Sequence, residues 1–152
     1  YSVGINASIT AELKNTIYLK LQASKLVMTK KILLDTNFLV APFQLSISIF
    51  EELDRLYPVN EIYTLEDAVQ EAKSIESGKY GKLVEKLIDT QDIKVLETEG
   101  KGSVDDLLVD ISDEFAVATN DKELKERLVD ERKEVVIIRG GNHLEAVNGN
   151  RL

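Results

Sequence analysis

The sequence predicts an α/β fold in three layers, with a central parallel β-sheet covered by helices on both faces. Two observations lead to this prediction. Short apolar runs with strand character alternate along the chain with segments whose apolar residues recur at helical spacing. The length of 152 residues, of which 43% are hydrophobic and 30% charged, suits one core and one main domain. Strands that alternate with helices are joined by crossovers, and crossovers produce a parallel sheet.

The same patterns give approximate bounds for each element. Four apolar runs predict strands at residues 31–35, 93–96, 115–119 and 135–138. Five segments with one apolar face predict helices at residues 47–57, 64–75, 80–89, 103–111 and 121–129. Gly140 and Gly141 end the last strand. We therefore assign residues 30–147 to one main domain and residues 148–152 to a tail.

Residues 1–29 have a different pattern from the rest of the chain. Apolar and mostly polar residues alternate from residue 3 to 13 and from 17 to 23, with a break at residues 14–15. This period of two predicts a β-hairpin extension. A translation start at Met28 would make residues 1–27 an appended or alternatively translated segment. A hairpin of this kind could extend a sheet edge or mediate self-association, so a homodimer is one expected assembly.

The composition excludes several classes of protein. The absence of Cys excludes disulfides, thiolate zinc sites and a cysteine nucleophile, and it is consistent with a cytoplasmic protein. No apolar run approaches the roughly 20 residues that a membrane span needs, and no signal peptide is visible. His143 is the only histidine and falls in a predicted C-terminal loop. A histidine dyad and a histidine-rich metal site are therefore excluded.

The net charge of -8 limits how this protein could bind nucleic acid. A domain with this charge repels phosphates at long range, so it is not a general polyanion binder. Either the acidic residues solvate the surface, or some of them converge on divalent cations that then contact a phosphate. The second interpretation requires particular carboxylates in particular places.

Two acids follow predicted strands directly. Asp35 ends the first strand, and Asp121 follows the strand at residues 115–119. In parallel sheets, ligand-binding groups gather beyond the carboxyl ends of the strands, so these two acids form a candidate site for Mg²⁺. Each also has a purely structural interpretation: Asp35 could cap a turn, and Asp121 could cap the following helix.

Helix geometry separates two neighbouring glutamates. Residues of a helix advance by about 100° each, which places Glu52 on the border of the apolar stripe of helix 47–57 and Glu51 nearly opposite that stripe. Glu51 also completes a capping box with Ser48. Glu52 therefore has no evident structural role and is the better candidate for the site.

The same test applies to the acid pair that opens helix 103–111. Ser103 is a suitable N-cap, and Asp106 would then be its capping-box partner. Asp105 lies nearer the apolar face, so we expect Asp105 to be the metal ligand and Asp106 to have a supporting role. The alternative is that both acids only stabilise the helix N-terminus.

Four stretches in this order resemble PIN domains, the nuclease family named after the PilT N-terminus. The stretches are KILLDTNFLV (31–40), SIFEELDRL (48–56), SVDDLLVDIS (103–112) and FAVATNDKELKERL (115–128). The resemblance implies a Rossmann-like PIN fold and a ribonuclease that uses Mg²⁺ or Mn²⁺. It places the four acids of the family on Asp35, Glu52, Asp105 and Asp121, with Asn37 and Thr119 as the polar residues that hold the pocket in order.

The spacing of these motifs resembles the ribosomal-RNA-processing branch more than the short toxin branch, which implies RNA as substrate. Two alternatives stay open: a catalytically silent module that binds RNA or protein, and a toxin with an antitoxin partner. Lys122, Lys125 and Arg127 are candidates for steering an RNA strand, although an ordinary solvated helix face would look the same. A phosphoacceptor domain is disfavoured because residues 31–34 place no acid beside Asp35.

Overall fold

The computed structural model describes residues 11–17, 19, 29–97, 104–111 and 114–148. Six strands form one sheet in the order β3-β2-β1-β4-β5-β6. They are β1 (Lys30–Leu34), β2 (Asn60–Leu65), β3 (Lys94–Leu96), β4 (Ala116–Ala118), β5 (Glu134–Arg139) and β6 (His143–Asn148). The helices are α2 (Thr36–Gln44), α3 (Ile49–Leu56), α4 (Glu66–Ser74), the 3-10 turn η1 (Ile75–Gly78), α5 (Gly81–Thr90), α6 (Val104–Ile111) and α7 (Lys122–Asp130).

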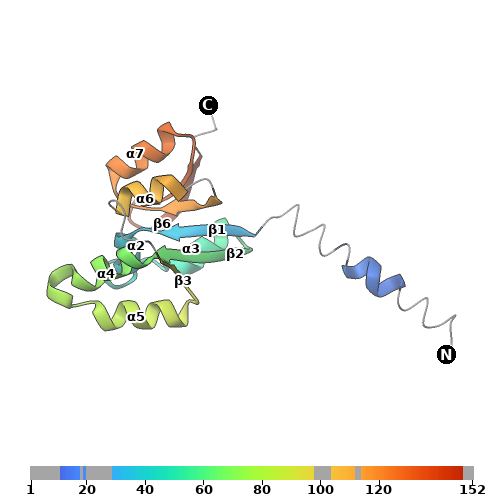
Figure 1. The fold of residues 1–152 in the computed structure, drawn as a ribbon, viewed down its shortest axis with the longest axis horizontal. Coiled ribbons are helices and arrows are strands. Elements are labelled where there is room, and N and C mark those ends of the chain that lie inside the picture. Colours follow the sequence, from blue (N-terminus) through green and yellow to red (C-terminus); the bar gives the residue numbers. More distant parts are fainter. Residues whose placement is uncertain (1–10, 18, 20–28, 98–103, 112–113, 149–152) are drawn as a thin grey trace.

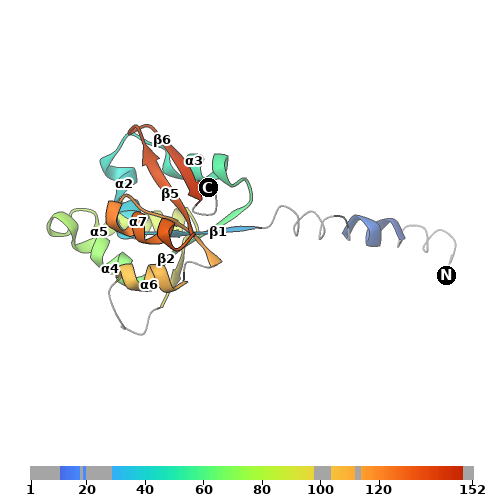
Figure 2. The same ribbon diagram turned by 90° about the horizontal axis from the view of Figure 1, so that it is seen from above.

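The helices cover the sheet on both faces, as predicted. Helices α6 and α7 lie on one side of the strands, and α2, α4 and α5 lie on the other (Figure 1). Helix α3 packs beside β6 at the edge of the sheet, as the view from above also shows (Figure 2). The fold is therefore a three-layer α/β/α sandwich, and its core consists mainly of the buried aliphatic residues of β1, β4 and β5 with the helix faces packed on them.

The order of the strands fixes where a ligand site can form. The chain runs from β1 outward through β2 to β3, then crosses back to β4 on the other side of β1. All pairings among β1 to β5 are parallel, so their carboxyl ends lie at one edge of the sheet. The connections leave β1 and β4 in opposite directions, which makes the gap between them a topological switch point. Asp35 and Asp121 follow these two strands.

Two elements between residues 36 and 65 differ from the sequence prediction. Helix α2 occupies residues for which the sequence pattern predicts no element, because the run FLVAPF is almost continuously apolar, contains Pro42 and shows no helical period. Strand β2 was also missed. The helix predicted at residues 64–75 begins only at Glu66, because Thr64 and Leu65 are the buried end of β2, where Thr64 is paired with β1 and Leu65 with β3.

The end of the domain also needs a correction. His143 does not lie in a C-terminal loop but begins β6, which pairs antiparallel with β5 from Arg139 outward. The turn between the two strands contains Gly140 and Gly141 with φ of +63° and +69°, values that residues with a side chain rarely adopt. The two glycines therefore form a hairpin turn that adds a sixth, antiparallel strand to the predicted parallel sheet.

The predicted N-terminal β-hairpin is wrong where the structure describes it. Residues 11–17 form a helix, whereas residues 1–10, 18 and 20–28 lie outside the described part. The helical segment contains Ala11, Glu12, Leu13 and Lys14, all strong helix formers, and a strand at this place would need a partner to satisfy its backbone. Across the described ranges, no helix is both long and apolar enough to cross a bilayer.

Candidate functional site

Asp35 and Asp121 begin two helices at the switch point. The Asp35 carboxylate caps α2 by accepting a hydrogen bond of 2.7 Å from the backbone N–H of Thr36. The Asp121 carboxylate caps α7 by accepting one of 3.0 Å from the backbone N–H of Leu124. Asp121 thus has the helix-capping role that the sequence allowed, whereas Asp35 caps a helix and not the turn that was considered for it. Each acid still has a second carboxylate oxygen outside the cap. The caps place both acids at the positive ends of helices, where negative charge is stabilised.

Thr119 connects the two acids across the sheet. Its hydroxyl donates a hydrogen bond of 2.7 Å to Oδ2 of Asp35 and accepts one of 3.0 Å from the backbone N–H of Asp121. Thr119 is fully buried and Asp35 is 5% exposed. The supporting role predicted for Thr119 thus has a geometric basis, because one hydroxyl fixes the spacing between the ends of β1 and β4.

A glutamate that the sequence analysis did not select reaches the same site. Glu71 lies on α4, and its Oε2 accepts a hydrogen bond of 3.1 Å from the hydroxyl of Thr36. A continuous chain of hydrogen bonds therefore runs from Glu71 through Thr36, Asp35 and Thr119 to Asp121. The sequence carries a signal for Glu71, since this residue directly precedes Ala72 on the apolar face of the helix predicted at residues 64–75.

The charges of four acids act on one another at this place. Burial raises the pKa of Asp35; its hydrogen bonds to Thr119 and Thr36 oppose that rise, and the charges of Asp121 and Glu71 add to it. Partial burial also raises the pKa of Asp105, and the charges of Asp35, Asp121 and Glu71 raise it further, while Arg127 lowers it. Mutual repulsion of this kind is relieved when a divalent cation binds between carboxylates.

The donor chemistry of this group fits a hard cation. Mg²⁺ and Mn²⁺ prefer carboxylate oxygens, and Mg²⁺ is usually held by one or two carboxylates together with waters. Within the ranges that the structure describes, however, no three acidic or histidine side chains are already close enough to hold one ion together. The four acids are close enough for their charges to shift the pKa values of Asp35 and Asp105. Their carboxylates would have to move closer to share a metal.

Glu52 has structural partners, contrary to the expectation that it has no structural role. Its carboxylate forms an ion pair with Arg55 and accepts a hydrogen bond of 2.9 Å from the backbone N–H of Leu144 in β6. The hydrogen bond from Arg55 is the main reason why the pKa of Glu52 is lowered. Glu52 is not among the main causes of the raised pKa values of Asp35 and Asp105. Hydrogen bonds through Thr36 join Glu71, and not Glu52, to Asp35, so Glu71 is a further candidate ligand and the role of Glu52 at the site stays a prediction.

The remaining predicted residues have mixed outcomes. Asp106 forms an ion pair of 3.0 Å with Arg127, which joins α6 to α7 beside Asp105. Asn37 is exposed on α2. Ser48 is the N-cap of α3 but its side chain makes no capping hydrogen bond, so the capping box with Glu51 is wrong. Ser103 lies outside the described residues.

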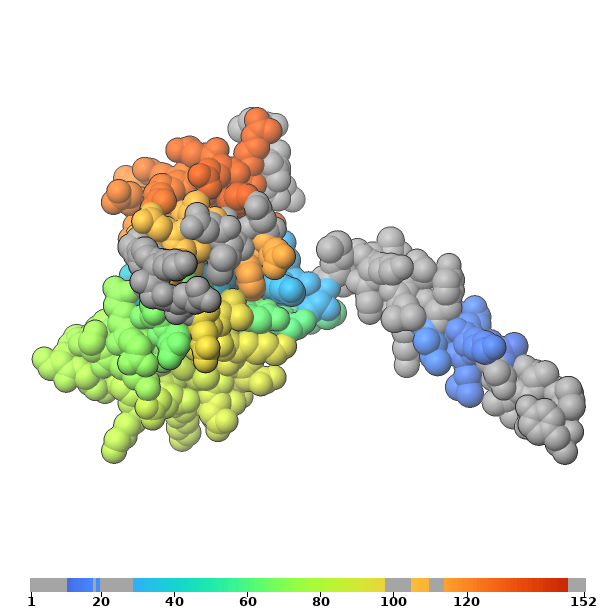
Figure 3. Space-filling view, in the orientation of Figure 1, coloured from blue at the N-terminus to red at the C-terminus, as the bar shows by residue number. Residues whose placement is uncertain are grey.

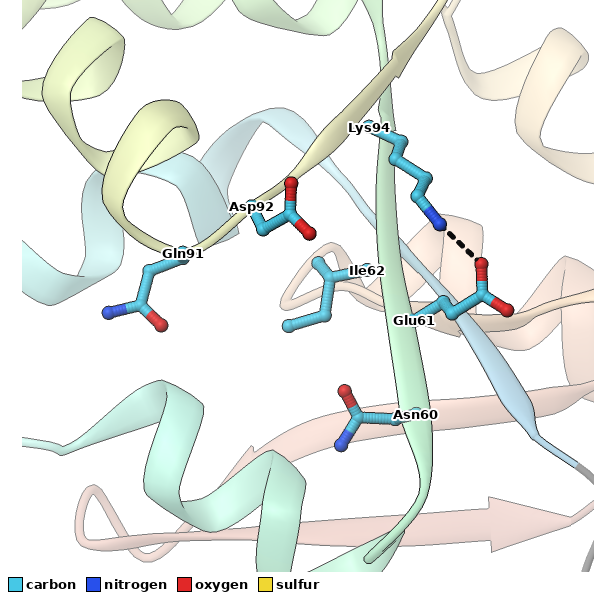
Figure 4. A pocket seen from close by; sticks show the side chains of 6 residues that line it. All are labelled: Asn60, Glu61, Ile62, Gln91, Asp92 and Lys94. Carbon is cyan, nitrogen blue, oxygen red and sulfur yellow. Dashed lines mark hydrogen bonds and ion pairs between the residues drawn. The ribbon is translucent and has the colours of Figure 1, made fainter.

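A pocket at the opposite end of the sheet is separate from the acids. It has a volume of about 210 Å³ and lies where β2 and β3 begin. Its lining residues are Asn60, Glu61, Ile62, Gln91, Asp92 and Lys94 (Figure 4). The side chains of Glu61 and Lys94 pair with each other across its rim. The switch-point rule places ligand chemistry at the carboxyl ends of the strands, so the size of this pocket does not make it the better candidate.

The comparison with known families decides what kind of domain this is. The model of the PIN-like domain family matches residues 32–141, which is more than half of the chain. The chain belongs to the PIN-like domain family. The match begins within β1 and includes Asp35, Glu71, Asp105 and Asp121, so all four acids lie inside the PIN-like domain. No curated protein matches the chain.

A solved structure supports the fold of this PIN-like domain. The structure of the PIN domain endonuclease Utp24 superimposes with a TM-score of 0.64 at 22% sequence identity. The match covers 80% of this chain and 92% of that chain. The predicted three-layer α/β PIN fold is thereby confirmed, and the structure adds the antiparallel strand β6 to it.

Proposed function

We propose that this PIN-like domain is a divalent-metal-dependent endoribonuclease. The observation that carries the proposal is the buried carboxylate of Asp35, which lies at the switch point of the sheet and whose pKa is raised by burial and by the neighbouring acids. A buried acid lowers the folding free energy gain, so an acid with a raised pKa in a ligand-binding position indicates a functional site. Binding a divalent cation is a use that matches carboxylate chemistry and the PIN family.

The proposed ligands are Asp35, Glu71, Asp105 and Asp121, with Glu71 replacing Glu52 in the original prediction. When bound, Mg²⁺ or Mn²⁺ would activate a water molecule and stabilise negative charge on the phosphate that is cut. Thr36 and Thr119 orient the carboxylates of Glu71 and Asp35 through their hydroxyl groups. Asp106 keeps Arg127 close to Asp105, where the guanidinium can contact a phosphate.

RNA is the proposed substrate, and ribosomal RNA precursors are the first RNAs to test. The order and spacing of the acidic motifs resemble the ribosomal-RNA-processing branch of the family. The matched endonuclease Utp24 supports internal cleavage as the mode of action. The chain's net charge of -8 argues against metal-free binding of RNA through the acidic site itself.

A cleavage assay tests the proposal. The full chain is incubated with single-stranded and structured RNA labelled at both ends, with Mn²⁺, with Mg²⁺ or with EDTA. We expect internal cuts that require a metal and that disappear in Asp35→Asn. Absence of cleavage by the unmodified chain, despite metal binding measured by calorimetry, would instead identify a silent PIN-like module.

A further inference from the structure

The loop between β4 and α7 is attached to the strands on both sides of β4 by the side chains of its first two residues. Thr119 donates its hydroxyl hydrogen bond to Asp35, at the end of β1. Asn120 reaches toward the other neighbour, and its side-chain Oδ1 accepts a hydrogen bond of 3.3 Å from the backbone N–H of Ile138 in β5. In Figure 3 the residues from 114 onward, coloured orange to red, lie mainly above β1, in blue. Thr119 therefore links this part of the domain to β1, whereas Asn120 holds the loop within it.

A side chain is needed at this place because β5 runs further than β4. The backbone pairing of the two strands ends with Ala118 and Val136, and the N–H of Thr119 adds a last bond to the carbonyl of Val136. Strand β5 continues beyond this point, whereas the chain after Thr119 leaves the sheet to begin α7. The N–H of Ile138 lies beyond the pairing, and the amide oxygen of Asn120 accepts its hydrogen bond as a peptide carbonyl would.

These two attachments bear on Asp121, which follows them directly in the chain. The backbone N–H of Asp121 is bonded to the hydroxyl of Thr119, and its carboxylate caps α7. With Thr119 alone, side chains would attach the loop only on the side of Asp35. Asn120 adds an attachment on the other side of β4. Attachments on opposite sides restrain rotation of the loop, so together they fix where the Asp121 carboxylate lies relative to Asp35.

A divalent ion shared by these acids requires their spacing to be held closely. Metal ligands have to lie within about 0.5 Å of their productive geometry, and the residues behind the ligands supply that precision. Without a metal the acids repel one another, since the charges of Asp121 and Glu71 both raise the pKa of Asp35. A loop attached on one side only could yield to this repulsion and carry Asp121 away from Asp35.

The hydrogen bond of Asn120 contributes more to the position of the loop than to the stability of the fold. Asn120 is exposed, whereas Thr119 is buried. If the Asn120 side chain is removed, water can accept the hydrogen bond from Ile138, and no buried polar group is left unsatisfied. A substitution at Asn120 therefore separates the two effects, because the fold persists while the loop loses one attachment.

We propose that Asn120 is a positioning residue that fixes Asp121 relative to Asp35 and so prepares the acidic group for a divalent cation. This inference rests on the proposed function for the choice of metal ligands. The side-chain oxygen of Asn120 already accepts the hydrogen bond from Ile138. Asn120 therefore acts through the loop that carries Asp121, and not as a metal ligand itself.

The test compares Asn120→Ala with Asn60→Ala in the full chain. Asn60 is the matched control, because its side chain also bonds to the backbone, at 2.7 Å from the carbonyl of Tyr57, but at the amino end of β2. Calorimetric titration measures the affinity for Mn²⁺, and thermal melting in EDTA measures stability. We expect Asn120→Ala to weaken Mn²⁺ binding by about 10-fold, as residues that orient metal ligands do. Its melting temperature should fall no more than that of Asn60→Ala, which should bind Mn²⁺ as the unmodified chain does.

Hydrogen exchange in EDTA tests the attachment without a metal. The reporter is the backbone N–H of Asp121, which is bonded to Thr119 and not to Asn120. Its exchange should be faster in Asn120→Ala than in the unmodified chain. Asn120→Asp keeps an oxygen acceptor for the N–H of Ile138 and should restore the slow exchange. Asn60→Ala should leave the exchange of Asp121 unchanged.

Unchanged Mn²⁺ affinity in Asn120→Ala, or equal losses of affinity in the Asn120 and Asn60 variants, would overturn the inference. An exchange rate at Asp121 that does not respond to Asn120→Ala would overturn it as well. Mn²⁺-dependent RNA cleavage by the unmodified chain is measured separately. A chain whose Mn²⁺ binding depends on Asn120 but that cuts no RNA would support the inference and contradict only the nuclease proposal. A chain that binds no Mn²⁺ would overturn both.

Discussion

The hydroxyl of Thr36 donates a hydrogen bond of 3.1 Å to Oε2 of Glu71, which joins the first turn of α2 to the middle of α4. The backbone N–H of the same residue bonds to Asp35. A single buried threonine therefore orients two acids that are 36 positions apart in the chain. This relationship identifies Glu71 as a member of the acidic group and makes Thr36 a positioning residue.

Replacing each of the two glutamates, Glu71 and Glu52, by glutamine tests this assignment. We expect Glu71→Gln to lower the kcat of Mn²⁺-dependent RNA cleavage by about 100-fold or more, because it removes a charge that would contact the metal or its water. Glu52→Gln should leave kcat within a few-fold and lower the melting temperature, because it weakens the contacts with Arg55 and Leu144. Loss of activity in Glu52→Gln alone, with Glu71→Gln active, would restore the original prediction.

Thr36→Val removes the hydroxyl and keeps the shape of the side chain. Residues that orient metal ligands typically change metal affinity or activity by about 10- to 100-fold when replaced. We expect a loss in this range in Mn²⁺ affinity, measured by calorimetry, and in kcat, with KM for RNA little changed. Thr36→Ser retains the hydroxyl and should recover both. A valine variant that binds Mn²⁺ normally would show that Glu71 needs no orientation by Thr36.

Thr119→Val should destabilise the folded chain. The substitution leaves buried Asp35 without one hydrogen bond and the backbone N–H of Asp121 without its acceptor. An unsatisfied buried polar group costs about 1–3 kcal/mol, and this loss can be measured by urea unfolding in EDTA. Thr119→Ser serves as the control, because it keeps the hydroxyl. Equal unfolding free energies for the valine and serine variants would contradict the proposed linking role.

The raised pKa of Asp35 predicts how stability depends on pH. The folded state binds the proton of the Asp35 carboxyl group more tightly than the unfolded state does. The Asp35 charge therefore does not lower the free energy of unfolding below the ordinary pKa of 3.8, and it lowers it fully above the folded-state pKa. Asp35→Asn removes the charge. In EDTA we expect the variant to melt at a higher temperature than the unmodified chain at neutral pH, with the difference shrinking on acidification.

Metal should reverse this order of stability. Mn²⁺ binds the folded state and should raise the melting temperature of the unmodified chain at neutral pH. The increase should be much smaller in Asp35→Asn, which lacks a proposed ligand. Differential scanning calorimetry in EDTA and in excess Mn²⁺ gives both comparisons. An Asn variant that is less stable than the unmodified chain in EDTA at every pH would show that the hydrogen bonds of Asp35 outweigh its burial.

The acids that follow strands were predictable from sequence because their placement depends on local rules. A short apolar run that ends in an acid fixes both the strand and the position of the acid, as the structure shows for Asp35 and Asp121. Glu71 and Glu52 could not be separated in this way. The choice between them depends on which helix packs near the end of β1, and that information lies in contacts between segments distant in sequence.

The sequence pattern also did not predict two elements, helix α2 and strand β6. Helix α2 is apolar on nearly every side because it is buried between the sheet and α4, so its pattern carries no helical signal. Strand β6 needed the hairpin turn at Gly140 and Gly141, which the sequence analysis treated only as the end of a strand. The first miss follows from tertiary packing, whereas the second concerns a local hairpin signal in the two glycines.

The contacts of Leu144 have a consequence for how the sheet ends. Its backbone N–H is bonded to Glu52, and its carbonyl accepts a hydrogen bond of 2.7 Å from Arg55. A strand from another molecule that approached β6 at this point would have to displace an ion pair before it found a free backbone group. Helix α3 thus protects the edge strand β6 against aggregation, because Glu52 and Arg55 occupy backbone groups to which a further strand would bind.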